Sequence, residues 1–185
     1  MSRKSWIAYA IIGLWLLGLA LALWWFQARY VRSFNEQAVI FSGNELTLPQ
    51  AIAGDGPIRL VHFWDPACPC NAGNQQHLAS LLEQYNGQIG FYAVQKPGTE
   101  GALPKTLSAL IPLSDFPGSQ SIPSTPAVGI WDKHGKLAYF GPYSAGITCN
   151  AGNSLIDPVL EALSQDRAVS VDNSLAVGCF CQWQK

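Results

Sequence analysis

Residues 61–71 read VHFWDPACPCN, and this stretch decides the fold class. Its apolar half predicts the end of a buried strand, Asp65-Pro66 breaks that strand, and Cys68 and Cys70 stand where a helix begins. The unpaired N–H groups at a helix N-terminus carry partial positive charge, which favours the ionised form of a thiol. The order of strand, break, thiols and helix therefore predicts reactive sulfur at the edge of a sheet.

The flanking sequence predicts an α/β domain with a mixed central sheet and helices on both of its faces. Ile58–Trp64 reads as the central strand, and apolar residues at helical spacing continue from the cysteines to Tyr85. A turn containing Gly135 joins two further strands into a hairpin. The other predicted elements are strands at 37–41 and 89–94, hairpin strands at 127–131 and 136–140, and helices at 47–53, 105–110 and 155–163.

The N-terminal region predicts a membrane anchor. Trp6 to Phe26 is a run of 21 uncharged residues, which as a helix is roughly 32 Å long and spans a bilayer core. Ala20-Leu21-Ala22 resembles a signal-peptide cleavage site, but the apolar run continues beyond it, so we favour an uncleaved anchor. Basic residues are balanced on the two sides of the run. The short N-terminal tail and the cysteine-rich body favour a single-pass protein of the inner membrane, with its soluble domain in the oxidising periplasm.

Charge and composition divide the chain into three expected parts: an anchor at 1–33, a folded domain at 34–166, and a cysteine-containing tail at 167–185. Beyond Arg32 there are seven basic and twelve acidic residues, which leaves about −5 on the soluble part. No basic stripe interrupts this acidic balance, so nucleic-acid binding is not expected.

Two landmarks in the right order carry a resemblance to a known family. Phe63-Trp64 is followed by two residues, Ala67 and Cys68, and Pro126 stands six residues before Asp132, ahead of the hairpin. From about Gln37 to Asp166 the chain resembles the thioredoxin-fold family, in its membrane-anchored periplasmic form. Two features depart from the family pattern: Ala67 stands where Trp is usual, and Cys68-Pro69-Cys70 is one residue shorter than Cys-x-x-Cys.

The resemblance implies roles for individual residues. It makes Cys68 the attacking cysteine, but the family's resolving cysteine has no direct match. We expect Cys70 to resolve the mixed disulfide, because a Cys-x-Cys bond is strained and easily passed on. The resemblance also makes Pro126 a cis-proline facing the sulfurs and Thr125 a residue whose backbone binds a peptide. The implied partners are protein thiols or disulfides, and no cofactor is implied. From the residues alone, His62 is expected in the core, and Asp65 is expected to cap the helix.

Three further cysteines are expected at the same edge of the sheet. Cys149 lies in the loop after the hairpin, and the pentapeptide CNAGN that starts at Cys70 recurs there. The tail has room to return, because the twelve residues between Asp166 and Cys179 span about 40 Å when extended. Three arrangements stay open: a Cys68–Cys70 redox pair with Cys149 bridged to Cys179 or Cys181, a relay between the front and tail pairs, and a thiolate metal site.

The leading hypothesis is a membrane-tethered thiol–disulfide oxidoreductase, with Cys68, Cys70 and Pro126 catalytic and Thr125 binding the substrate. The alternative is a protein that binds or delivers copper or zinc on the same fold. Its ligands would come from the five cysteines: Cys68, Cys70, Cys149, Cys179 and Cys181.

Overall fold

A mixed sheet of six strands forms the centre of the domain in the computed structural model, which describes residues 3–34, 43–146, 151–167, 169, 171–172 and 176–184. The strands lie side by side in the order β4-β3-β2-β6-β7-β8. Their bounds are β2 Ile58–Trp64, β3 Ile89–Gln95, β4 Ile111–Leu113, β6 Ala127–Trp131, β7 Leu137–Gly141 and β8 Val171–Asp172.

The strand directions are those of a thioredoxin-like fold. β2 and β3 run parallel and are joined by α2 (Asn71–Gln84), whereas β6 is antiparallel to β2 and forms a hairpin with β7. A second helix, α3 (Asp157–Ser164), follows the hairpin, with Pro158 in its first turn. Every residue of β2 is buried, because this strand lies at the middle of the sheet. The mixed α/β fold predicted from the sequence is confirmed.

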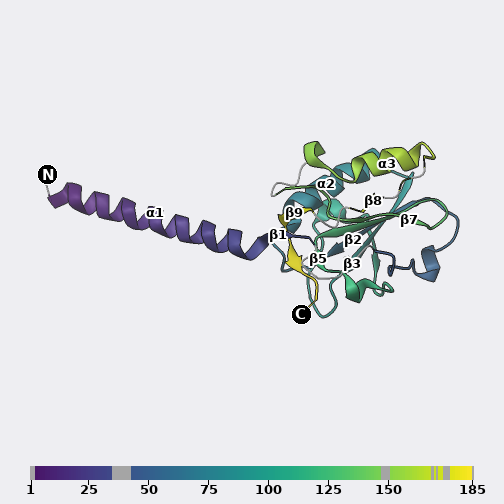
Figure 1. Cartoon of the computed structure of the whole chain (residues 1–185), viewed down its shortest axis with the longest axis horizontal. Coiled ribbons are helices and arrows are strands. Elements are labelled where there is room, and N and C mark those ends of the chain that lie inside the picture. The colour runs from purple at the N-terminus through teal and green to yellow at the C-terminus, as the bar shows by residue number, and fades with distance from the viewer. Residues whose placement is uncertain are drawn as a thin grey trace.

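The two faces of the sheet are covered differently from the prediction. Both α2 and α3 lie on one face, as Figure 1 shows, and Leu78, Leu81 and Leu160 pack there against Leu60 and Ile130. An aromatic cluster covers the other face, and its members include Phe63, Phe116, Trp131, Phe140, Phe180 and Trp183. Phe180 lies between the C-terminal strands β9 (Val177–Cys179) and β10 (Cys181–Gln182), and Trp183 directly follows β10.

The prediction of a helix at 105–110 is wrong. The chain there forms only a 3₁₀ turn, η2 (Lys105–Leu107), before it enters the edge strand β4. Proline at 104 and at 112 leaves too few residues for an α-helix between them. The other 3₁₀ turns are η1 (Gln50–Ile52), where a short helix was predicted, η3 (Ser119–Ser121) and η4 (Ala151–Asn153). The predicted first strand at 37–41 lies outside the described residues.

The N-terminal helix projects away from the domain (Figure 1). This helix, α1, runs from Arg3 to Tyr30, and its segment Lys4–Tyr30 is long and apolar enough to cross a membrane. Its large apolar side chains are exposed, with Trp6 and Trp24 each more than two-thirds accessible. Strand β1 (Val31–Ser33) follows at once and pairs with β9, so the end of this helix lies beside the C-terminal strands.

Candidate functional site

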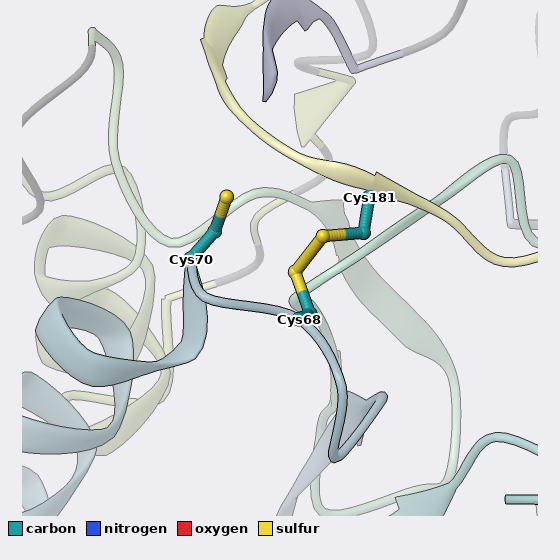
Figure 2. Close-up of side chains that lie close together, drawn as sticks. All are labelled: Cys68, Cys70 and Cys181. Atoms are coloured by element: carbon teal, nitrogen blue, oxygen red, sulfur yellow. A yellow bond between two sulfur atoms is a disulfide. The ribbon is translucent and has the colours of Figure 1, made fainter. Parts of the chain in front are cut away.

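Four cysteines meet where β2 ends and α2 begins. Cys68 is bonded to Cys181, with their Cα atoms 6.0 Å apart, and Cys70 is bonded to Cys179, with their Cα atoms 5.5 Å apart. Figure 2 shows the first of these bonds, with the Cys70 sulfur beside it. Cys68 and Cys70 precede the first residue of α2, a position called the helix mouth below. Each of them is joined to a cysteine of the tail that is more than 100 residues away in sequence.

Of the three arrangements left open by the sequence, this pairing differs from the first, a Cys68–Cys70 pair with Cys149 bridged to Cys179 or Cys181. The physical reason is the return of the tail, which runs along the helix mouth and brings two sulfurs within disulfide range of the front pair. Cys149 itself lies outside the described residues. Gly146, three residues before it, donates a backbone hydrogen bond to the carbonyl oxygen of Val177 in the tail.

The loop that carries Cys68 is shaped by Asp65. The Asp65 carboxylate accepts a hydrogen bond from the backbone N–H of Ala67 (2.9 Å), and its carbonyl oxygen accepts from the N–H of Cys68 (2.9 Å) and from the side chain of Asn71 (2.7 Å). Asp65 was expected to cap α2. The residue before the helix is instead Cys70, and Asp65 stabilises the turn that precedes it.

Thr125, the residue expected to bind a peptide, lies directly against the Cys68 sulfur. The Thr125–Pro126 peptide bond is cis, and the carbonyl oxygen of Thr125 is 3.7 Å from the Sγ of Cys68. The Thr125 hydroxyl donates to the carbonyl oxygen of Phe63 (3.0 Å), which fixes the short strand β5 (Ser124–Thr125) to the end of β2. β5 pairs antiparallel with β10, and Cys181 lies opposite Thr125 in the register.

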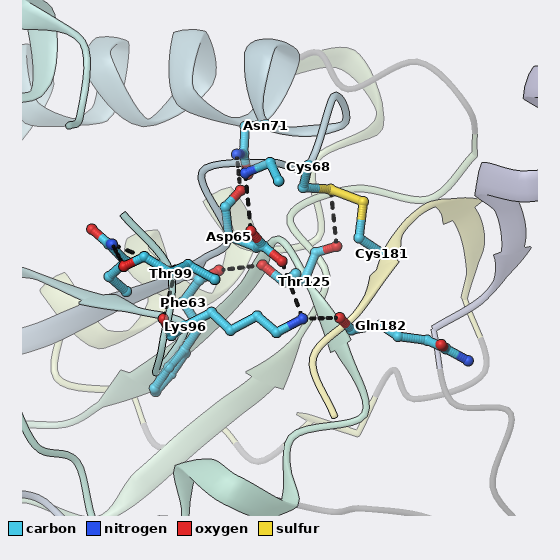
Figure 3. A network of polar contacts seen from close by, with 11 residues as sticks. Phe63, Asp65, Cys68, Asn71, Lys96, Thr99, Thr125, Cys181 and Gln182 are labelled. Atoms are coloured by element: carbon cyan, nitrogen blue, oxygen red, sulfur yellow. Dashed lines mark hydrogen bonds and ion pairs between the residues drawn. A yellow bond between two sulfur atoms is a disulfide. The ribbon is translucent and has the colours of Figure 1, made fainter. Parts of the chain in front are cut away.

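Lys96 is a site residue that the sequence analysis missed. Its ammonium group forms an ion pair with Asp65 (3.1 Å) and donates to the carbonyl oxygen of Gln182 in β10 (2.9 Å), as Figure 3 shows. It therefore links the loop before Cys68 to the tail. Topology contained the signal for it, because Lys96 follows β3, and the carboxyl ends of parallel strands share one edge of the sheet.

A cavity of about 430 Å³ opens beside the Cys68–Cys181 bond. Its lining includes both cysteines, and its charged residues are three cations and one carboxylate: Arg29, Arg32, Lys96 and Asp65. An excess of positive charge next to sulfur stabilises the thiolate over the thiol. This cavity therefore suits a step in which a thiolate enters or leaves.

His62 is confirmed as a core residue of β2. It is fully buried, and its Nδ1 lies 2.8 Å from the hydroxyl of Tyr143. Burial lowers the pKa of His62 to about 3, so its ring is neutral at physiological pH. His62 therefore packs in the core as a neutral side chain, as the sequence predicted.

The comparisons with known proteins place the chain in a family. The chain belongs to the family described as Domain of unknown function (DUF6436). The match covers residues 37–183, which include both disulfides and the cis-proline. No curated protein matches the chain.

Several solved structures are similar to this DUF6436 chain. A hypothetical protein from Sinorhizobium meliloti 1021 is 18% identical, with a TM-score of 0.53 over 84% of this chain and 98% of the other. An uncharacterized conserved protein from Geobacillus kaustophilus is 19% identical, with a TM-score of 0.53 over 84% and 95%. A thioredoxin-like protein in its oxidized form is 15% identical, with a TM-score of 0.44 over 74% and 97%. At such identities the first two show a shared fold.

The sulfur atoms of the site are close enough to react with one another. The Sγ atoms of Cys68, Cys70 and Cys181 all lie within 4.8 Å of each other, and Cys179 is bonded to Cys70. Disulfides exchange when a thiolate attacks one of the two bonded sulfurs. Once one bond is opened, the released thiolate has the other bond within reach. In the reduced state, the same sulfurs form a cluster of soft donors.

Proposed function

We propose that the protein is a thiol–disulfide oxidoreductase that is tethered to a membrane and acts on cysteines of partner proteins. The observation that carries the proposal is the placement of the Cys68–Cys181 bond, which lies on a basic cavity and against the backbone of Thr125-Pro126. A reactive disulfide needs an accessible sulfur, a stabilised leaving thiolate and a surface that holds the partner. These three requirements meet at this position.

The proposed reaction transfers two electrons. In the reduced protein, the Cys68 thiolate attacks one sulfur of a partner disulfide, and the other partner sulfur leaves as a thiolate. The Cys70 thiolate then attacks Cys68 in the mixed disulfide, which releases the second partner sulfur and leaves a Cys68–Cys70 bond. The partner is reduced and the protein is oxidised. Run in reverse, the same steps oxidise a partner dithiol.

The proposed tether is α1, because its exposed apolar side chains need a bilayer around them. The tether and the site are neighbours: Tyr30, the last residue of α1, packs against the cysteine cluster, and its carbonyl oxygen accepts from the N–H of Phe180 (3.0 Å). Exchange would thus take place close to the membrane surface, with the domain in the periplasm. The expected test is retention of the chain in the membrane fraction after an alkaline wash.

Replacement of Cys68 tests the reaction. We expect Cys68→Ser to abolish exchange between the full chain and a dithiol protein, because the serine hydroxyl does not form a disulfide. The matched control is Ser80→Ala on the exposed surface of α2, which should keep the full rate. The rate is followed by mass spectrometry of alkylated thiols. Full exchange in Cys68→Ser would rule out the proposed role of this residue.

Binding of Cu(I) or Zn is a second candidate function, favoured by the three sulfurs within 4.8 Å of one another. It requires the reduced state, since thiolates and not disulfides bind these metals. Anaerobic reduction of the full chain followed by metal analysis tests it. Stoichiometric copper or zinc that is lost in Cys70→Ser would support this function, and no bound metal would remove it.

A further inference from the structure

We propose that the C-terminal segment, residues 176–184, occupies the partner-binding groove of this protein and must be released by thiol exchange before a partner binds. The inference rests on the proposed function and adds a regulation of the same site. In the structure, the groove is closed by a segment of the chain itself. The partner that replaces this segment is an extended peptide with a cysteine opposite Thr125.

The backbone pairing of the C-terminal segment is that of a bound peptide. β10 adds to the edge of β5 as an antiparallel strand, with Cys181 opposite Thr125 and Gln182 opposite Ser124. Addition of a strand to an exposed edge is a common way to bind an extended peptide. The side chain of Cys181 then reaches Cys68 and is bonded to it. The segment therefore has both the pairing and the covalent bond of a substrate in a mixed disulfide.

Two aromatic side chains anchor the segment in the groove. Phe180 and Trp183 are each only 4% exposed, and they belong to the aromatic cluster on the sheet face without helices. The ring centroid of Phe180 is 5.3 Å from that of Phe34, and the centroid of Trp183 is 6.1 Å from that of Phe63. A partner segment that takes this place needs similar side chains, so we infer an aromatic residue on each side of its cysteine, one before it and one two residues after.

The backbone of the segment is also held from both sides. The N–H of Phe180 donates to Tyr30 at the end of α1, and the N–H of Trp183 donates to the carbonyl oxygen of Pro123 (3.4 Å). Lys96 donates to the carbonyl oxygen of Gln182. With these bonds in place the groove has no room for a second strand, so partner binding requires the segment to leave.

The cavity decides which disulfide opens first. It is lined by Cys68 and Cys181 and not by Cys70 or Cys179, and Cys181 is the least buried of the four. A thiolate of a dithiol reductant, which needs the cavity and not the groove, enters there and attacks the Sγ of Cys181, and Cys68 leaves as a thiolate. The second thiolate of the reductant then attacks the reductant sulfur in that mixed disulfide. The reductant gains an internal disulfide, and Cys181 is released and takes a proton from water.

The second bond opens without further reduction. The Cys68 thiolate lies within 4.8 Å of the Sγ of Cys70 and attacks it, and Cys179 leaves as a thiolate. One disulfide is formed and one is broken, so no electrons are gained or lost in this step. The products are a Cys68–Cys70 bond and a C-terminal segment without covalent attachment. A single dithiol, which supplies two electrons, thus releases both bonds of the segment.

Hydrogen exchange of the full chain in detergent micelles tests the release. We expect the amides of Phe180 and Trp183 to exchange on the order of tenfold faster or more after treatment with a small dithiol, while the amides of β2 keep their rates. Replacement of Cys149 by serine leaves the four described cysteines as the only thiols in this experiment. Unchanged protection of residues 180 and 183 in fully reduced protein would overturn the proposal.

Capture of a peptide tests the occupancy of the groove. The probe is the synthetic peptide of residues 177–184 with Cys179→Ser and with its remaining thiol activated as a thiopyridyl disulfide. Trp183→Ala in the full chain removes an anchor of the segment, and we expect reduced Trp183→Ala protein to release thiopyridone from the probe on the order of tenfold faster than reduced wild type. Gln182→Ala, whose exposed side chain carries none of these contacts, is the matched control and should react as wild type does.

Reaction with glutathione disulfide separates this inference from the proposed function, because a small disulfide reaches Cys68 without filling the groove. If reduced wild type does not react with glutathione disulfide, the proposed function fails. If it does react, and Trp183→Ala and wild type capture the peptide at equal rates, only the occupancy of the groove is overturned. Equal capture of a scrambled peptide by Trp183→Ala would overturn it as well.

Discussion

The two Cys-x-Cys sequences of this chain have the same spacing and different surroundings. Cys68-Pro69-Cys70 lies in the turn that opens α2, with Pro69 exposed. Cys179-Phe180-Cys181 joins two short strands, β9 and β10, with Phe180 buried in the aromatic cluster. Neither pair is closed on itself, and each cysteine of one pair is bonded to a cysteine of the other.

The difference assigns separate tasks to the two pairs. The front pair belongs to the thioredoxin-like scaffold and is positioned by the ends of β2 and β3, whereas the tail pair is positioned by its own aromatic anchor and by strand pairing. One pair supplies the reactive helix mouth, and the other supplies the segment that reacts with it. Substitutions in the front pair and in the tail pair should therefore lower the free energy of unfolding by different amounts.

The largest expected effect comes from removal of both bonds. Because 113 residues separate Cys68 from Cys181, loop entropy gives that bond about 5 kcal/mol, so reduction of both disulfides should lower the free energy of unfolding by about 7 kcal/mol. Removing only the nested bond, in Cys70→Ala/Cys179→Ala, should cost about 2 kcal/mol, since the remaining bond still closes the long loop. Urea denaturation in detergent micelles measures both values. Equal losses would show that the Cys68–Cys181 bond adds no stability and would contradict the loop-entropy argument.

The next largest change in the free energy of unfolding is expected for the residues between the two cysteines of each pair, Phe180 and Pro69. Phe180→Ala should lower the free energy of unfolding by about 3 kcal/mol or more, because it leaves a cavity beside Phe34 in the aromatic cluster. Pro69→Ala is the matched change in the front pair, where the side chain is exposed, and it should change stability by less than about 1 kcal/mol. The same denaturation experiment compares them. A loss in Pro69→Ala as large as that in Phe180→Ala would contradict the assignment of the anchor to the tail.

The link between the two pairs depends on Lys96. Lys96→Met should cost about 2–3 kcal/mol, because it leaves the mostly buried Asp65 carboxylate without its partner and removes the hydrogen bond to Gln182. Lys105→Met changes an exposed lysine in the same way and should be neutral. A double-mutant cycle with Asp65→Asn isolates the ion pair. Purely additive effects in that cycle would mean that the two side chains act separately.

Acid should act on the domain and not on the C-terminal segment, because residues 176–184 have no ionisable side chain apart from the cysteines. Burial lowers the pKa of His62 from 6.5 to about 3, so between these values the unfolded chain binds the extra proton. Stability from this group is complete above pH 6.5 and is lost as the pH falls toward 3, by roughly 2 kcal/mol at pH 5. His62→Asn should flatten this pH dependence of unfolding. An unchanged slope in that variant would exclude His62 as its source.

The sequence predicted the scaffold and the meeting of the four described cysteines, but not how they bond. Ile58–Trp64 and the hairpin strands were predictable because a continuous apolar run and a glycine turn are local signals. The thioredoxin-like landmarks placed Cys68 and Pro126 at one edge for the same reason. The bonds to Cys179 and Cys181 depend on the register of β10 against β5, which is set by contacts distant in sequence. Lys96 was not predicted as a site residue, because the local sequence does not distinguish it from any other lysine at the end of a strand.

The proposed division into anchor, domain and tail also depends on long-range contacts. The boundaries at 33 and 166 stay predictions from composition. The tail beyond residue 176 adds strands and aromatic side chains to the folded body, so a tail and a domain that differ in sequence character share one core. A composition change alone does not reveal such a return of the chain.

The most direct measurement of the central claim is the state of the thiols in two matched variants, both with Cys149→Ser. Cys70→Ser/Cys179→Ser keeps Cys68 with Cys181, and Cys70→Ser/Cys181→Ser keeps Cys68 with Cys179. After mild oxidation and alkylation, mass spectrometry should find the first variant fully bonded and the second with both thiols alkylated. Free thiols in the first variant, or equal bonding in both, would contradict the joining of the helix mouth to the C-terminal segment through Cys68 and Cys181.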